Sequence, residues 1–173
     1  MKTTIGTGNP LEHAQFAVPP LHIPDGVGGC FKTELVLNRS LQSVEKIHWW
    51  HAPDPRRDPH NHPWCDEAGI AFRSTVIAGG YREMRWWFMD GELCSVPKRY
   101  IAGDVNVMPH AVYHTVDQVL PGTVTRMVTG PVVPDGDWGY LIAGKYVSAK
   151  DDPYPNGSFM DQLREINPHK RAT

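Results

Sequence analysis

Short runs of alternating apolar and polar residues, each bounded by or close to a glycine or proline, recur through the middle of the chain. They are rich in β-branched and aromatic residues and follow one another at about 8–12 residue spacing, which is typical of short strands. The runs cover residues 46–51, 72–77, 81–89, 93–101, 104–108, 113–119 and 123–128. Asp90-Gly91, between two of these runs, predicts a tight hairpin turn. This pattern predicts an all-β sandwich or barrel.

The two ends of the chain differ from this middle part. Residues 1–33 are rich in glycine and proline and predict an irregular arm that covers a sheet edge or reaches a neighbouring subunit. Residues 34–145 contain the predicted strands and form the barrel. Within residues 146–173, Ser158 is the expected N-cap of a short helix over residues 159–166, which packs on the outside.

Composition narrows the class of protein. The chain has 173 residues, enough for about one domain. Its net charge of -2 argues against a nucleic-acid or anionic-membrane binder, and no apolar run approaches the roughly 18 residues that span a bilayer. The N-terminus lacks the apolar core of a secretory signal. Cys30, Cys65 and Cys94 cannot all pair and show no C-x-x-C spacing, which predicts reduced thiols in a cytoplasmic protein.

Candidate chemistry lies in the histidines. His60 and His62 are separated by one residue, and in an extended chain such a pair projects to the same face, roughly 6.5–7 Å apart. Two imidazoles placed in this way can converge on one ion at about 2.1 Å from each nitrogen. Taken alone, the H-x-H motif fits two surface histidines in a polar loop better, because Asp58-Pro59 and Pro63 flank it.

A second motif lies further along the chain. Gly103 to His114 reads G-x5-P-x-A-x2-H, which resembles the second motif of the cupin superfamily, G-x5-P-x-G-x2-H, with Ala111 at the usual glycine. His60, His62 and Glu67 match the H-x-H-x4-E portion of the first cupin motif.

The first motif is only partly present. Asp54 and Ser74 stand where the superfamily has its two flanking glycines, and Gly79-Gly80 follow the second of these positions by five or six residues. HNHPW followed by FRSTVIAGGYRE also resembles small, uncharacterised bacterial and phage cupins with an HDHPW…S-x-V-L-x-G-G-Y-x-E pattern. The resemblance covers roughly the stretch from Lys46 to Trp138.

The resemblance implies a cupin barrel, a double-stranded β-helix or jelly roll, with one metal ion inside. It assigns His60, His62 and His114 as imidazole ligands, and the motif spacing adds Glu67. Glu83 is the alternative acidic ligand or a catalytic acid/base, because it would lie on the next strand, beside His114. The implied cofactor is one divalent transition metal, which is Fe, Mn, Ni or Zn. Three imidazoles and at most one carboxylate leave positions open for water or substrate, as in catalytic sites.

These features lead to one functional hypothesis and two alternatives. The first is a metal-dependent cupin enzyme acting on a small polar molecule, with dioxygenase chemistry for Fe(II) and isomerase, lyase or hydrolase chemistry for Zn, Mn or Ni. The others are a binding module for a sugar or carboxylate, and a structural or assembly protein on a cupin scaffold. Outward aromatic rings predict a homodimer. An inward arginine, for which Arg73 and Arg85 are candidates, would need a carboxylate or an anionic substrate as its partner.

Overall fold

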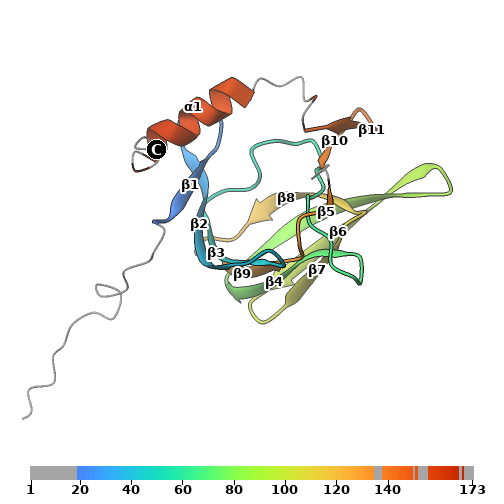
Figure 1. Ribbon diagram of the computed structural model, residues 1–173, viewed down its shortest axis with the longest axis horizontal. Helices are drawn as coiled ribbons and strands as arrows, with labels where there is room; N and C mark the ends of the chain where they lie inside the picture. Colours follow the sequence, from blue (N-terminus) through green and yellow to red (C-terminus); the bar gives the residue numbers. More distant parts are fainter. Residues whose placement is uncertain (1–18, 135–137, 150, 152–155, 168, 170–173) are drawn as a thin grey trace, which may run out of the picture.

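The computed structural model describes residues 19–134, 138–149, 151, 156–167 and 169, which form a β-rich body with one helix at its side (Figure 1). The elements in chain order are β1 (Leu21–Pro24), β2 (Cys30–Arg39), β3 (Val44–Trp50), β4 (Ile70–Ala78), β5 (Gly80–Met89), β6 (Glu92–Ile101), β7 (Val105–Pro109), β8 (Tyr113–Val119), β9 (Val124–Thr129), β10 (Gly139–Ile142), β11 (Lys145–Ser148) and α1 (Asn156–Ile166).

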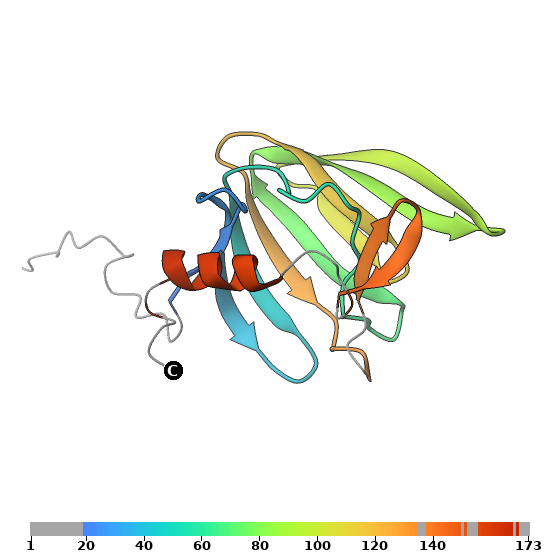
Figure 2. The ribbon, with the colours of Figure 1, turned by 90° about the horizontal axis from the view of Figure 1, so that it is seen from above.

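The strands form two main antiparallel sheets that face each other (Figures 1 and 2). The larger sheet has the order β1-β2-β3-β9-β4-β7, the smaller has the order β6-β5-β8, and β10 and β11 form a separate hairpin. Several neighbours, such as β3 and β9, β4 and β7, and β5 and β8, are not consecutive in the chain, because strands cross from one sheet to the other. The all-β class predicted from the alternation is confirmed.

The chain passes from β4 to β5, and so from the larger sheet to the smaller, at a single glycine. β4 belongs to the larger sheet and β5 to the smaller, and only Gly79 separates them. Gly79 has a φ of 68°, and a Cβ atom there would lie 2.7 Å from the Cα atom of Thr123. A larger residue is therefore excluded both by backbone conformation and by space. The crossing places the start of β5, which carries Glu83, inside the molecule.

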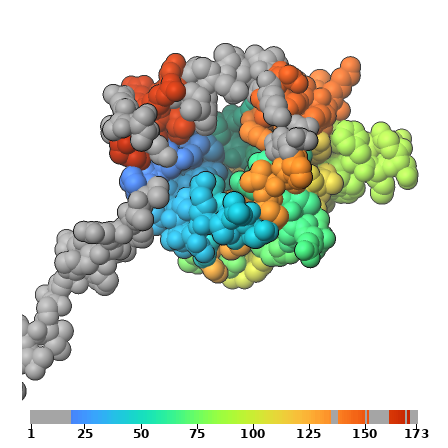
Figure 3. Space-filling model, in the orientation of Figure 1, coloured from blue at the N-terminus to red at the C-terminus, as the bar shows by residue number. Residues whose placement is uncertain are grey.

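The hairpin between β5 and β6 has the predicted turn. Met89 pairs with Glu92, which leaves Asp90 and Gly91 as a two-residue loop. Their φ values of 52° and 83° are those of a type I′ turn, whose twist matches that of the flanking strands. The hairpin projects beyond the rest of the body (Figures 1 and 3).

The structure differs from the sequence-based expectation at both ends. The range predicted as an irregular arm contains β1 and the start of β2, which extend the larger sheet, while residues 1–18 lie outside the described part. The helix α1 begins at Asn156, ahead of the expected cap at Ser158. It lies against β1, where Asn167 accepts a hydrogen bond from the backbone N–H of His22 at 2.8 Å and donates one to the carbonyl of His22 at 2.7 Å.

The interior combines apolar clusters with buried polar side chains. One cluster contains Ala71, Phe72, Met108 and Met127, and a second contains Val76, Tyr81 and Val116. Polar side chains are as fully enclosed: Glu83 is 0% exposed, Asn106 1% and His114 6%. Buried polar groups are costly unless they are hydrogen-bonded, so their partners identify the part of the interior that carries chemistry.

Candidate metal centre

Three imidazoles converge inside the body. His60 and His62 come from an extended segment before β4, and His114 comes from the start of β8. One ring nitrogen from each residue lies within 4.8 Å of the others, and the Nε2 atoms of His62 and His114 are 2.9 Å apart. The backbones of His60 and His114 exchange two hydrogen bonds, of 3.0 and 2.8 Å. The structure thus brings together the three histidines that the sequence singled out, and this group can hold a metal ion.

The segment that carries His60 and His62 is held by β10. The side chain of Asn61 accepts a hydrogen bond from the N–H of Gly139 at 2.8 Å, and the N–H of Asn61 donates to the Gly139 carbonyl at 3.1 Å. Leu141 donates a further backbone hydrogen bond to the carbonyl of Pro59 at 2.8 Å. Because the segment is not part of a regular sheet, these contacts and the bridge to β8 fix the direction of both imidazoles.

Aromatic rings enclose His62. Its ring stacks on Trp64 at a centroid distance of 5.1 Å and meets the edge of Phe72 at 5.0 Å. Burial, reinforced by the charge of His114, holds the pKa of both His60 and His62 well below the usual value. The two imidazoles are therefore neutral near pH 7, which is the form that binds a metal ion.

A buried carboxylate holds the third imidazole. Glu83 Oε2 lies 3.0 Å from Nδ1 of His114, and Glu83 Oε1 accepts a hydrogen bond from Nε of Arg85 at 2.6 Å. Burial alone would raise the pKa of Glu83, but the interactions with His114 and Arg85 outweigh it and lower this pKa. An ionised Glu83 favours a proton on Nδ1 of His114 and directs the Nε2 atom toward the other two imidazoles. This pairing is common behind metal-binding histidines.

A polar network fixes the carboxylate in turn. Asn106 donates from Nδ2 to Tyr81 at 2.7 Å and lies 3.2 Å from each oxygen of Glu83. Arg85 also donates to the Asn106 carbonyl oxygen, and to the Tyr100 hydroxyl at 2.8 Å. Arg85 is thus the inward arginine with a carboxylate partner. Arg73, the other candidate, pairs with Asp66 at 2.7 Å, and its side chain is 49% exposed.

Glu67 lies apart from the three imidazoles. It occupies an exposed turn before β4, and it is not part of the metal-ligand group found among the described residues. Asp66 stabilises this turn by accepting hydrogen bonds from the N–H groups of Ala68 and Ile70 at 2.9 and 2.8 Å. The chain therefore turns within the H-x-H-x4-E spacing instead of continuing as a strand, and this turn carries Glu67 to the surface.

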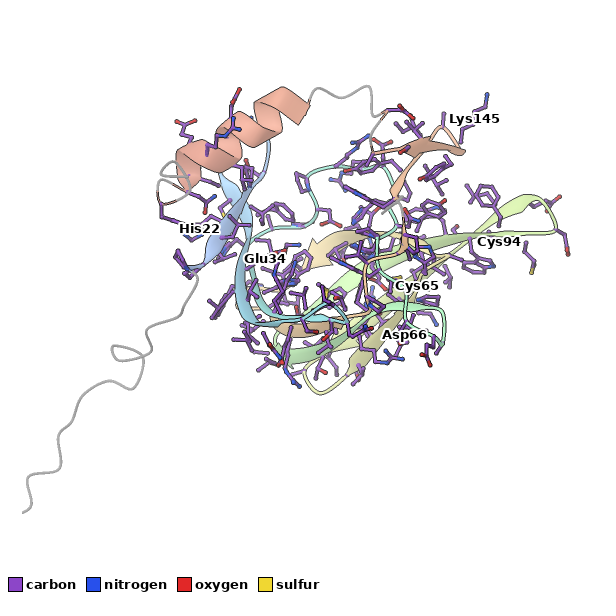
Figure 4. The ribbon with its side chains drawn as sticks, viewed as in Figure 1. His22, Glu34, Cys65, Asp66, Cys94 and Lys145 are labelled. Carbon is purple, nitrogen blue, oxygen red and sulfur yellow. The ribbon has the colours of Figure 1, made fainter. Side chains whose placement is uncertain are left out.

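A small cavity of about 80 Å³ opens beside the three imidazoles. Sequence reasoning gave no role to several charged or titratable side chains that line it, which are Lys32, Glu34, Lys46, His48 and Asp54. Figure 4 shows Glu34 within the cup formed by the sheets. Of the two neighbouring histidines on or after β3, His48 is 3% exposed and faces this cavity, whereas His51 is exposed.

Two facing antiparallel sheets with three converging imidazoles between them are the arrangement that the resemblance to cupins implies. The imidazoles come from an H-x-H segment and from the end of a G-x5-P-x-A-x2-H segment. The expected all-β class is confirmed, and the described strands form two facing sheets as expected for a barrel of this kind. Within the described residues, no helix is both long and apolar enough to cross a membrane.

Comparisons with known proteins give similarities at low identity. An RmlC-like cupin from Shewanella frigidimarina is 18% identical over 69% of this chain and 88% of its own, with a TM-score of 0.44. HEPD of Streptomyces albus, solved with 2-hydroxyethylphosphonate and Fe(II) bound, is 15% identical over 69% of this chain, with a TM-score of 0.49. An oxalate decarboxylase variant of Bacillus subtilis is 18% identical over 66% of this chain, with a TM-score of 0.46.

The chain spans only 26% of the length of HEPD and 28% of that of the oxalate decarboxylase. No family model and no curated protein matches the sequence.

Proposed function

We propose that this protein is a metal-dependent cupin enzyme that acts on a small polar molecule bound in the cavity. In this proposal His60, His62 and His114 hold one divalent transition metal. The observation that carries it is the convergence of three imidazole nitrogens, one of which is oriented by a buried carboxylate. Imidazole donors suit Fe, Ni and Zn among the expected ions, and Mn is compatible with the same site when oxygen ligands complete it.

The residues around the metal have separate tasks. When bound, the cation supplies a Lewis acid or, if it is iron, a redox centre. Three imidazoles leave coordination positions for a substrate. Glu83 positions His114, since its oxygens are engaged by His114, Arg85 and Asn106. Glu67, on its exposed turn, is not included in the ligand set.

Asp54 is the carboxyl group that we propose for acid–base work. It lines the cavity, and its Oδ2 accepts a hydrogen bond from the N–H of Val116 at 2.7 Å. Burial raises the pKa of Asp54, although the charges of His114 and Lys32 act in the opposite direction. A raised pKa brings a carboxyl group closer to the range in which it both accepts and releases a proton near neutral pH. The sequence analysis gave Glu83 a catalytic role. In this proposal Glu83 positions His114, and Asp54 carries out the acid–base step.

The reaction class that we expect depends on which metal ion is bound. With iron the proposal predicts dioxygenase chemistry, and with zinc, manganese or nickel it predicts isomerase, lyase or hydrolase chemistry. A homodimer in the cytoplasm remains the expected state. A binding module for a sugar or carboxylate would use the same cavity, and it differs from the enzyme in showing saturable binding without turnover.

Metal content tests the proposal. We expect about one equivalent of a transition metal in protein purified without chelator, or after titration with Fe(II), Mn, Ni or Zn. A His60→Ala/His62→Ala variant should lose this metal, whereas the control His51→Ala, at an exposed histidine outside the group, should retain it. Equal metal content in the double variant, or a folded wild-type protein that takes up no ion in the titration, would contradict the proposal.

A further inference from the structure

A second group of charged side chains lines the same cavity. Lys32 and Glu34 lie on β2 and Lys46 and His48 on β3, and the two strands pair with Glu34 opposite His48. The register and the period of two place these residues on one face, which borders the cavity. The side chains of Lys32, Glu34 and Lys46 are only 17%, 13% and 13% exposed. They are therefore interior groups rather than a solvated surface.

This group carries more positive than negative charge. Glu34 pairs with Lys32 at 3.2 Å and with Lys46 at 3.1 Å, so one carboxylate serves two ammonium groups. Burial, reinforced by the charge of Lys32, lowers the pKa of His48 to about 3, which leaves its imidazole neutral at pH 7. These four side chains together have one net positive charge, while Asp54 and Glu83 line other parts of the same cavity. Within the described part of the chain, Glu34 is the acidic partner of both lysines.

Aromatic rings hold both ammonium groups close to the imidazole site. Lys32 Nζ lies 5.0 Å from the ring centre of Trp50, and Lys46 Nζ lies 5.4 Å from that of Trp64. Trp64 in turn stacks on His62, so a single ring separates the charge of Lys46 from a proposed metal ligand. Contacts of this kind stabilise a cation that is partly withdrawn from water.

On this side of the cavity, the ammonium groups of Lys32 and Lys46 have N–H donors that Glu34 does not engage. Each ammonium group has three N–H donors, and the pairing with Glu34 takes one from each. The Nε2 atom of His48 is buried and lies 3.4 Å from Glu34 Oε1, but it makes no hydrogen bond among the described residues. Ammonium donors that are withdrawn from water and lack a second acceptor are costly, and an anion that enters the cavity would supply that acceptor.

We propose that Lys32 and Lys46 form an anion-binding subsite, and that the substrate is a small carboxylate. Its charged end lies on the two lysines and another oxygen reaches the three-histidine site. The single net charge of the group matches one carboxylate. A water needs roughly 10–15 Å³ of such space, so a cavity of about 80 Å³ takes a molecule of roughly five to eight non-hydrogen atoms. This inference rests on the proposed function, because it takes the same cavity as the substrate site.

Titration calorimetry on the metal-loaded protein tests the subsite. The probes are glycolate, lactate and pyruvate as small carboxylates, ethylene glycol as an uncharged analogue of glycolate, and inorganic phosphate. We expect at least one carboxylate to bind with a Kd in the millimolar range or below, and at least tenfold more tightly than ethylene glycol, since a charged hydrogen bond is worth roughly a tenfold to hundredfold change. Binding of none of the carboxylates, or equal binding of ethylene glycol, would overturn the proposal.

Four variants separate a binding role from a structural one. Lys32→Met and Lys46→Met should each weaken carboxylate binding about tenfold or more, whereas Glu34→Gln should tighten it, because it removes the competing carboxylate. The control is Lys145→Met, at an exposed lysine of the β10–β11 hairpin that Figure 4 shows far from Glu34. Because the expected effects have opposite signs, general destabilisation cannot imitate them. Unchanged affinity in both lysine variants would overturn the subsite, and tighter binding of phosphate than of any carboxylate would overturn the substrate class.

The two proposals fail in distinguishable ways. If the wild-type protein takes up no metal, the proposed function fails, and the lysine dependence of carboxylate binding is still measurable on the metal-free protein. The other case is that one metal equivalent binds and is lost in His60→Ala/His62→Ala, while the affinity for carboxylates is unchanged in Lys32→Met and Lys46→Met. In that case only the subsite proposal fails.

Discussion

The cavity has a buried carboxylate on each of two sides, and their surroundings differ. Glu83 is 0% exposed and its partners are the planar guanidinium of Arg85, the imidazole of His114 and the amide of Asn106. Glu34 is 13% exposed and its charged partners are two lysines. Directional planar donors fix one orientation of a carboxylate, whereas ammonium groups on flexible stems act as point charges. The surroundings of Glu83 therefore suit a carboxylate with one fixed orientation. Those of Glu34 suit a site at which the lysines can exchange one anion for another.

The largest expected loss of stability comes from replacing Glu83, the carboxylate with the directional partners. Glu83→Ala leaves the 12% exposed Arg85 without its carboxylate, and removing one partner of a buried pair costs about 3–5 kcal/mol. Chemical denaturation should show this loss, while Glu92→Ala, at the exposed start of β6, should change stability by less than about 0.5 kcal/mol. The milder Glu83→Gln should lower metal affinity about 10–100-fold. A loss of stability below about 1 kcal/mol in Glu83→Ala would show that the network does not support the fold.

The second prediction concerns acid stability on the lysine side. The pKa of His48 is about 3 in the folded protein, against about 6.5 in an unfolded chain. Between these values the unfolded state binds a proton that the folded state does not. Stability is therefore complete above about pH 6.5 and decreases as the pH falls, by up to about 1.4 kcal/mol per pH unit from this group.

Comparing variants isolates the contribution of His48. Denaturation of wild type and His48→Gln between pH 7 and 4 should show a shallower slope in the variant, because a glutamine side chain has no proton to gain. The other groups that face this position, Glu34, Lys32 and Lys46, are common to both proteins. Parallel curves for wild type and His48→Gln would refute the assignment of a buried neutral imidazole.

The smallest effect is expected at the other arginine that the sequence proposed. Arg73 pairs with Asp66 as Arg85 pairs with Glu83, but its side chain is 49% exposed. Exposed ion pairs contribute about 0–1 kcal/mol because water and salt screen them. Arg73→Ala should therefore lower stability by less than about 1 kcal/mol, and 1 M salt should abolish the difference. A salt-resistant loss of several kcal/mol would mean that this pair is structural.

The elements that the sequence predicted well have local causes. The turn at Asp90-Gly91 depends on two adjacent residues that adopt positive φ. The three histidines lie in two short motifs, and the resemblance of these motifs to those of cupins groups the three residues together. Such features need no knowledge of distant contacts, so they can be read from a single sequence.

The residues that were missed depend on long-range packing. On β2, Phe31 and Leu35 are buried on one face, while Lys32 and Glu34 face the cavity on the other. The alternation of apolar and polar residues along β2 defines two faces, but it does not tell which face borders the cavity. The polar face of a strand normally faces solvent. The choice between Glu67 and Glu83 likewise depends on where the chain turns before β4, because that turn takes Glu67 to the surface.

The hydrogen bonds between Asn61 and Gly139 of β10 also have a consequence for the order in which the chain folds during synthesis. The segment with His60 and His62 is fixed by Gly139 and Leu141, which are synthesised almost eighty residues later. A nascent chain emerging from the ribosome cannot lock its first two imidazoles in place until that late strand has also appeared. The fixing of these two imidazoles therefore waits for the synthesis of β10.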